Sequence, residues 1–122
     1  MDASALLALL NAEDGSALVQ EFLPRSIIST VNLAEVVTRL SILGMPEKEV
    51  CEALTVLGLE IISFDEEQAF RVGFLSAYTH PLGLSLGDRA CLALALTTHA
   101  AALTADRVWR DLHIGVEIKL IR

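Results

Sequence analysis

The chain has 122 residues, of which 53% are hydrophobic and 20% charged, and its formal net charge is −7. One domain over residues 1–122 is expected at this length, and the acidic balance excludes a protein that coats nucleic acid through a basic face. The sequence contains no apolar stretch long enough to span a membrane, and the first residues lack the basic segment of a signal peptide. A cytoplasmic protein with no membrane partner is therefore expected.

Glycines and prolines separate segments of regular hydrophobic periodicity along the whole chain. In chain order, the pattern predicts helices at 4–12 and 15–23, a strand at 26–29, helices at 31–43 and 46–57, a strand at 59–64, helices at 65–78 and from 85 onward, a strand at 101–104, a helical turn at 106–111 and a strand at 116–121. The helix that begins at residue 85 is apolar on nearly every side, which predicts that it is buried. Strands that alternate with helices predict a mainly parallel sheet with helices on both faces.

Three smaller patterns also lead to structural expectations. Cys51 and Cys91 lie in apolar helical segments, which predicts buried, reduced thiols. Gln68 follows Asp65 by three residues, as in a helix capping box. The six aromatic residues lie mostly in positions typical of a core, and Trp109 is expected to pack rather than to stack on a base.

Four acidic residues lie where an α/β sheet places its functional site, near the carboxyl ends of strands. Asp2 starts the first helix, Glu35 lies in the helix after the first strand, Asp88 lies in the first turn of the buried helix, and Asp106 follows the strand at 101–104. Each acid also fits a structural role, as a helix cap or, for Glu35, as the partner of Arg39 four residues on.

Taken together, the four carboxylates indicate a metal site. Carboxylates that face one edge of a sheet repel one another, and a divalent cation relieves this repulsion and keeps them ionised. Ligation by oxygen alone favours Mg²⁺ or Mn²⁺. Such ions activate water and stabilise in-line displacement at phosphorus.

The sequence resembles the PIN-domain family and, within it, the VapC-type toxins of toxin–antitoxin pairs. The matching segments span nearly the whole chain: MDASALLALLNAE at 1–13, STVNLAEVVTRL at 29–40, LSLGDRACLALA at 84–95, LTADRVW at 103–109 and VEIKLI at 116–121. The resemblance implies a three-layer α/β/α sandwich and Mg²⁺- or Mn²⁺-dependent cleavage of RNA. It also implies an antitoxin partner and a homodimer.

The same resemblance assigns residues to roles. Asp2, Glu35, Asp88 and Asp106 take the places of the family's first to fourth acids, and Ser4 matches the hydroxyl residue that orders the acid cluster. In the family, three to five apolar residues form a central strand before the first acid, whereas only Met1 precedes Asp2 here. Either this strand is a stub, or the true start lies upstream.

Other residues have two interpretations each. Asp111 shares the role of Asp106 if this chain follows family members that have Asn at the fourth position. Arg39, Arg89, Arg107 and Arg110 either contact RNA phosphate or balance the acids, with Arg89 and Arg107 favoured for RNA.

The apolar residues of the two helices at 31–57 either form core only or line a groove for an antitoxin helix. These residues are Leu40, Ile42, Leu43, Met45, Val50, Leu54 and Leu57.

Three other functions remain open from the sequence. A Mg²⁺-dependent DNA nuclease uses similar chemistry, and the preference for RNA rests on the resemblance. A catalytically inactive PIN domain would serve as a binding module. A receiver-type signalling domain would use Asp65, Thr104 and Lys119, but it leaves Glu35 and Asp88 without a role.

Overall fold

The computed structural model describes all residues from 1 to 122. Its helices are α1 (Ala3–Leu10), α2 (Ser16–Phe22), α3 (Thr30–Ile42), α4 (Glu47–Thr55), α5 (Glu66–Thr79) and α6 (Leu86–Thr98), with 3-10 turns η1 (Leu23–Arg25), η2 (His80–Leu82) and η3 (Arg107–Asp111). Its strands are β1 (Ile27–Ser29), β2 (Glu60–Ile62), β3 (Ala102–Thr104) and β4 (Ile118–Leu120). Every element predicted from the sequence is present, with shifts only at the ends. None of the helices has the length and apolarity that crossing a membrane requires.

The first two residues join two separate pairs of parallel strands. β1 pairs with β2, and β3 pairs with β4. The amino group of Met1 donates a 2.7 Å hydrogen bond to the carbonyl of Ile27, and the N–H of Asp2 donates a 3.0 Å bond to the carbonyl of Leu103. Residues 1 and 2 therefore lie between β1 and β3, in the place of a central strand. These two residues, the stub, connect both halves of the sheet.

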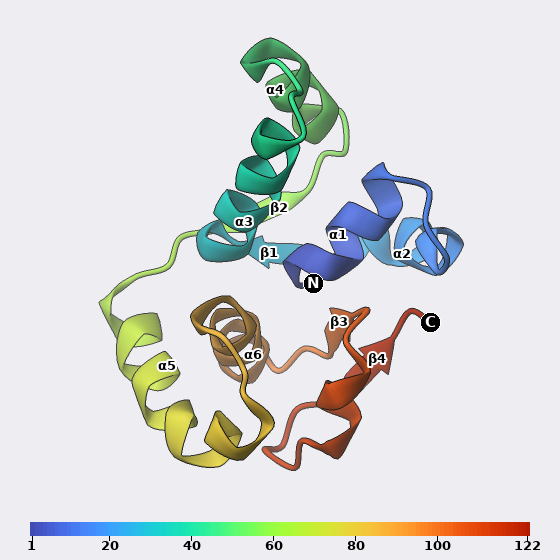
Figure 1. Ribbon diagram of the computed structural model, residues 1–122. Helices are drawn as coiled ribbons and strands as arrows, with labels where there is room; N and C mark the ends of the chain where they lie inside the picture. Colours follow the sequence, from blue (N-terminus) through green and yellow to red (C-terminus); the bar gives the residue numbers. More distant parts are fainter.

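The helices form layers on both faces of this strand region (Figure 1). One buried cluster joins α1 to α3 and β1, with Leu6, Ile28 and Val36 at its centre. A second buried cluster joins α5 and α6 to η3 and contains Leu92 and Trp109. Because α6 is buried from Ala90 to Ala95, its apolar sequence is explained by packing on both the sheet and α5. The predicted α/β/α arrangement is confirmed.

The burial expected for four side chains was wrong. Phe70, Phe74 and Tyr78 form an aromatic row on the outer face of α5, with 59%, 70% and 71% of each residue exposed. Their spacing of four residues places them on one side of the helix, and this side faces away from the second core. Cys51 is exposed, whereas Cys91 is buried as expected.

The predicted capping box at the start of α5 is only half formed. The side chain of Asp65 accepts a 2.9 Å hydrogen bond from the N–H of Gln68, as a helix cap should. The Gln68 side chain does not return this bond; its amide donates to the hydroxyl of Thr97 in α6 at 2.6 Å. Gln68 is buried, so packing of α5 on α6 has redirected its side chain.

Candidate active site

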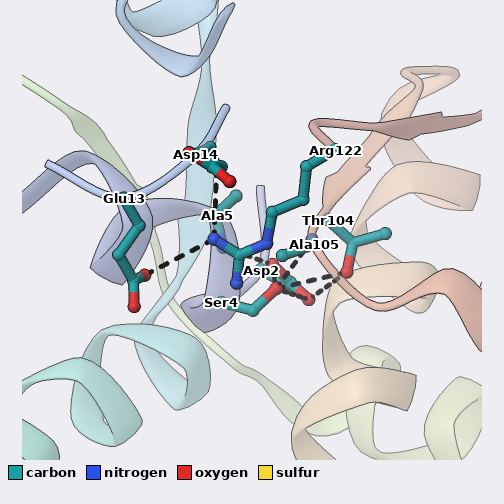
Figure 2. A network of polar contacts seen from close by, with 8 residues as sticks. All are labelled: Asp2, Ser4, Ala5, Glu13, Asp14, Thr104, Ala105 and Arg122. Carbon is teal, nitrogen blue, oxygen red and sulfur yellow. Dashed lines mark hydrogen bonds and ion pairs between the residues drawn. The ribbon is translucent and has the colours of Figure 1, made fainter. Parts of the chain in front are cut away.

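Asp2 is a buried carboxylate held by three neighbours (Figure 2). Its Oδ1 accepts a 2.9 Å hydrogen bond from the N–H of Ala5, which caps α1. The hydroxyl of Ser4 lies 2.8 and 2.9 Å from its two oxygens, and the hydroxyl of Thr104 donates to Oδ2 at 2.6 Å. A carboxylate offers about four acceptor positions, so these three donors leave capacity for one more partner.

Thr104 links Asp2 to the fourth predicted acid, Asp106. The Thr104 oxygen that donates to Asp2 also accepts a 3.0 Å hydrogen bond from the N–H of Asp106. The carboxylate of Asp106 itself accepts a 3.0 Å bond from the N–H of Val108 and caps η3. Ser4 supports the same turn, because its oxygen accepts from the N–H of Ala105 at 2.9 Å. The ends of the stub and of β3 are thus joined by two hydroxyl groups.

Glu35 approaches the first turn of α6 from α3. Its Oε2 accepts a 3.0 Å hydrogen bond from the amide of Asn32, and the same amide donates to the carbonyl of Gly87 at 2.9 Å. The carboxylate lies so close to Gly87 that a Cβ atom there would collide with it. Asn32 is 1% exposed, and its Oδ1 has no hydrogen-bond partner. A buried amide and a glycine therefore fix where Glu35 sits.

Asp88 has a structural role as well as a place beside Glu35. Its Oδ2 accepts from the N–H of Ser85 at 2.9 Å, and the hydroxyl of Ser85 accepts from the N–H of Asp88 at 3.1 Å. This reciprocal pair is the capping box that the sequence predicted for α6. The cap engages one oxygen of Asp88, and the carboxyl group remains near enough to Glu35 for its charge to act there.

The pKa of Glu35 responds to the charges of two of the other predicted acids. Burial raises the pKa of Glu35, the hydrogen bond from Asn32 opposes this rise, and the charges of Asp88 and Asp2 add to it. Burial also raises the pKa of Asp2, although Thr104, Ala5, Ser4 and the terminal amino group lower it. The ion pairs of the chain, Lys48–Glu52, Arg71–Glu67, Lys119–Glu117 and Arg122–Glu13, include none of these acids. None of these ion pairs neutralises Glu35 or Asp88, whereas the terminal amino group supplies a positive charge near Asp2.

The PIN-domain family model matches residues 1–114 of this chain. The chain belongs to the PIN-domain family. Its fold is similar to that of DNA-bound VapBC from Salmonella typhimurium, with a TM-score of 0.76 and 17% identity over 99% of this chain and 96% of that one. It is also similar to VapBC2 from Rickettsia felis bound to a promoter DNA fragment, with a TM-score of 0.71 and 20% identity over 95% and 92% of the two chains. No curated protein sequence matches the chain significantly.

The donor chemistry of this PIN domain fits a hard divalent cation. Asp2, Glu35 and Asp88 offer oxygen only, and the charges of Asp88 and Asp2 make ionisation of Glu35 more costly. The unpartnered Oδ1 of Asn32 adds a further buried oxygen beside them. As the side chains are placed, no three acidic, histidine or cysteine groups are close enough to enclose one ion.

The arginines favoured for RNA contact are engaged within the PIN domain. The guanidinium of Arg89 donates to the carbonyl of Val72 at 2.9 Å and ties α6 to α5. Arg107 is exposed, and its Nε donates to the carbonyl of Arg122 at 3.4 Å. Trp109 is fully buried, as expected for a packing residue. Arg39 lies four residues after Glu35, but the ion pair considered between the two is not formed.

The predicted apolar groove is present between α3, α4 and β2, with a different lining. We call this cavity of about 650 Å³ the α3–α4 groove. Of the residues expected there, Val50, Leu54 and Leu57 line it, and Leu33 and Val37 of α3 complete the wall. Leu40 is buried in the core instead, and Ile42 and Leu43 lie outside with exposures of 73% and 63%.

Sequence reasoning missed three residues of the site: Asn32, Gly87 and Thr104. All three lie inside the segments that carry the PIN resemblance, directly beside the acids. A polar amide three residues before Glu35 on a helix was a usable signal, because residues at this spacing share a face. The need for glycine at position 87 was not readable, because it arises from a contact between α3 and α6.

Proposed function

We propose that this PIN domain is a single-domain, Mg²⁺- or Mn²⁺-dependent endoribonuclease of the VapC toxin type that acts in the cytoplasm. The observation that carries the proposal is the approach of three carboxyl groups at the carboxyl edge of the sheet, where the charges of Asp88 and Asp2 act on Glu35. Family membership supports a nuclease, and the fold shared with two VapBC structures supports the toxin type. The alternative of a receiver-type domain is set aside because the PIN family model covers residues 1–114.

In this proposal the role of each acid follows from its surroundings. Asp2, Glu35, Asp88 and Asp106 hold the cation, which when bound supplies positive charge against the phosphate and lowers the pKa of water. Glu35 accepts the proton of the attacking water, because its raised pKa suits a general base and its side chain remains open to solvent. Asn32 aims the Glu35 carboxylate, while Ser4 and Thr104 favour the ionised form of Asp2 by donating to it.

The decisive experiment compares two variants, each of which replaces an acidic residue that accepts a hydrogen bond at the start of a helix. Purified protein is incubated with a defined set of RNAs, and with DNA of the same sequences, in Mg²⁺, Mn²⁺ or EDTA. Asp88→Asn is the test variant and Asp65→Asn the control, because each acid caps a helix but only Asp88 lies beside Glu35. Asn keeps an acceptor oxygen at both places, so both variants should remain folded.

We expect cutting of RNA that needs metal, falls on the order of 100-fold or more in Asp88→Asn and persists in Asp65→Asn. Equal loss in both variants would assign Asp88 to helix capping alone. A folded wild type that cuts nothing in either metal would instead indicate an inactive PIN domain that works as a binding module. Preferential cutting of DNA would overturn the RNA assignment.

An antitoxin partner is part of the proposal. The α3–α4 groove is lined mainly by apolar side chains and is open along one side of the molecule. An amphipathic helix that lays its apolar face in such a groove is a common mode of recognition. Glu47, the acidic lining residue, would pair with a basic residue of that helix.

A homodimer is the second partner in the proposal, and the aromatic row of α5 supports it. Beside this row lies a parallel row of small exposed residues, Ala69, Gly73 and Ala77. In a two-fold arrangement the aromatic ridge of one α5 fits the small-residue groove of the other, which is how helices pack along rows of every fourth residue. The three aromatic residues expose roughly 400 Å² per chain if each offers about 200 Å² in full. This is about half of what one partner gives to a standard interface.

A further inference from the structure

A second, open groove adjoins the acidic site on the outer side of α3. We call this cavity of about 860 Å³ the Arg39 groove. Glu35 and Gly87 are among its lining residues, so a chain lying in it contacts the proposed base. Apolar side chains form part of its wall, and two of them, Ile42 and Leu86, are 73% and 55% exposed. The groove therefore offers an uncovered apolar surface next to carboxylates.

Arg39 is the one basic side chain of the chain without a partner in the protein. The chain has nine Lys and Arg residues. The other eight make a hydrogen bond, an ion pair or a contact with an aromatic ring: Arg25, Lys48, Arg71, Arg89, Arg107, Arg110, Lys119 and Arg122. Arg39 makes none of these, is exposed and is the only one of the nine that lines the Arg39 groove.

Arg39 is significant because the protein as a whole is acidic and repels phosphate. The protein carries a net charge of −7, and Glu35, the acidic residue that lines the groove, repels a phosphate chain. The free guanidinium of Arg39 lies one helical turn from Glu35 and can donate two parallel hydrogen bonds to a phosphate group. The exposed apolar wall offers a surface for the face of a base. Phosphate and base together are the chemistry of a nucleotide.

We propose that the Arg39 groove is the subsite that binds a nucleotide of single-stranded RNA next to the cleaved bond, with Arg39 holding its phosphate. The inference rests on the proposed nuclease function and adds to it the residue that grips the substrate. It replaces Arg89, whose guanidinium is occupied by the carbonyl of Val72, as the arginine expected to contact RNA.

The test measures RNA binding separately from cutting. A short fluorescein-labelled single-stranded RNA is titrated with protein in Mg²⁺ at several salt concentrations, and fluorescence anisotropy gives the affinity. All proteins carry Asp88→Asn to suppress cutting. Arg39→Ala is the test, Arg39→Lys retains the charge, and Arg71→Ala removes an exposed arginine from α5 as the matched control.

We expect Arg39→Ala to weaken binding about tenfold, as the loss of a charged hydrogen bond does. It should also lower the slope of log affinity against log salt by about 0.7, which corresponds to one phosphate contact on a single strand. Arg39→Lys should keep the slope and lose part of the affinity, and Arg71→Ala should change neither. An Arg39→Ala protein with unchanged affinity and slope, or one that behaves like Arg71→Ala, overturns the subsite.

Cleavage by the otherwise unmodified protein separates this inference from the proposed function. If the wild type cuts RNA and Arg39→Ala leaves KM unchanged, the nuclease stands and the subsite is wrong. If nothing is cut but binding still depends on Arg39, the subsite stands and the protein is a binding module.

Discussion

The hydroxyl of Thr104 donates a 2.6 Å hydrogen bond to Oδ2 of Asp2, across 102 positions of sequence. The same oxygen accepts from the N–H of Asp106, so one threonine joins the first and fourth acids of the family pattern. Both partners lie at the carboxyl edge of the sheet, where the stub and β3 end side by side. The placement of Asp2 thus depends on β3 as much as on its own helix.

Replacing Thr104 with valine keeps the shape of the side chain and removes this bond. We expect the free energy of unfolding to fall by about 1–3 kcal/mol, because the buried carboxylate of Asp2 and the N–H of Asp106 both lose a partner. The pKa of Asp2 should also rise further, since the lost bond favours its ionised form. Urea unfolding measures the first effect. Thr98→Val is the control, because the Thr98 hydroxyl only donates to the carbonyl of Leu94 in its own helix.

Gly87→Ala should separate stability from activity. Alanine in a helix is favoured over glycine by about 0.5–1 kcal/mol, but its Cβ would displace the Glu35 carboxylate. We therefore expect little or no loss of stability and a fall of metal-dependent cleavage on the order of tenfold or more. Gly73→Ala in α5, where a Cβ meets nothing within 4 Å in the single chain, is the control for stability alone and should stabilise the fold. Full activity in Gly87→Ala would show that Glu35 does not need its observed position.

The stability of the metal-free protein should depend on pH in the direction set by Asp2 and Glu35. Both pKa values are raised in the folded state above the ordinary values of 3.8 and 4.5. The folded state therefore binds more protons than the unfolded chain, so this contribution to stability is full below these values and is lost as pH rises through the raised pKa values. Thermal unfolding in EDTA from about pH 4 to about pH 7 measures the slope against an Asp2→Asn variant, in which the fall should be smaller.

Metal should reverse this loss at neutral pH. A divalent cation binds the ionised acids of the folded state only, so Mg²⁺ or Mn²⁺ should raise the unfolding temperature at about pH 7 with a dependence on metal concentration. The Asp2→Asn variant should respond much less. Identical curves for the wild type and Asp2→Asn, with and without metal, would argue against a cation at these acids.

The aromatic row of α5 should decide the association state. Phe74→Glu places a charge in the middle of the row, so we expect a dimer of the wild type to become a monomer in sedimentation velocity or light scattering. Val56→Glu, at an apolar position that is 79% exposed near the end of α4, is the matched control and should leave the dimer intact. A wild type that is monomeric at all concentrations would contradict the proposed dimer.

The sequence by itself determined the secondary structure and the layer arrangement, and it predicted which four acids form the site. Hydrophobic periodicity placed the buried helix α6 correctly, because an apolar segment of this length has few alternatives to the core. The capping box of Ser85 and Asp88 was also readable, since both residues lie within one turn of helix. Such patterns involve residues that are close in sequence, so they can be predicted without the tertiary structure.

Only the tertiary structure decided which side chains meet across the sheet edge. Asn32 lies on α3 and Gly87 on α6, and their contact with Glu35 exists only because these helices pack together. Packing also left Phe74 exposed and occupied the guanidinium of Arg89, against what their sequence positions suggested. A helix has several faces of similar composition, and the face that becomes buried is chosen by the neighbours that the rest of the chain brings to it.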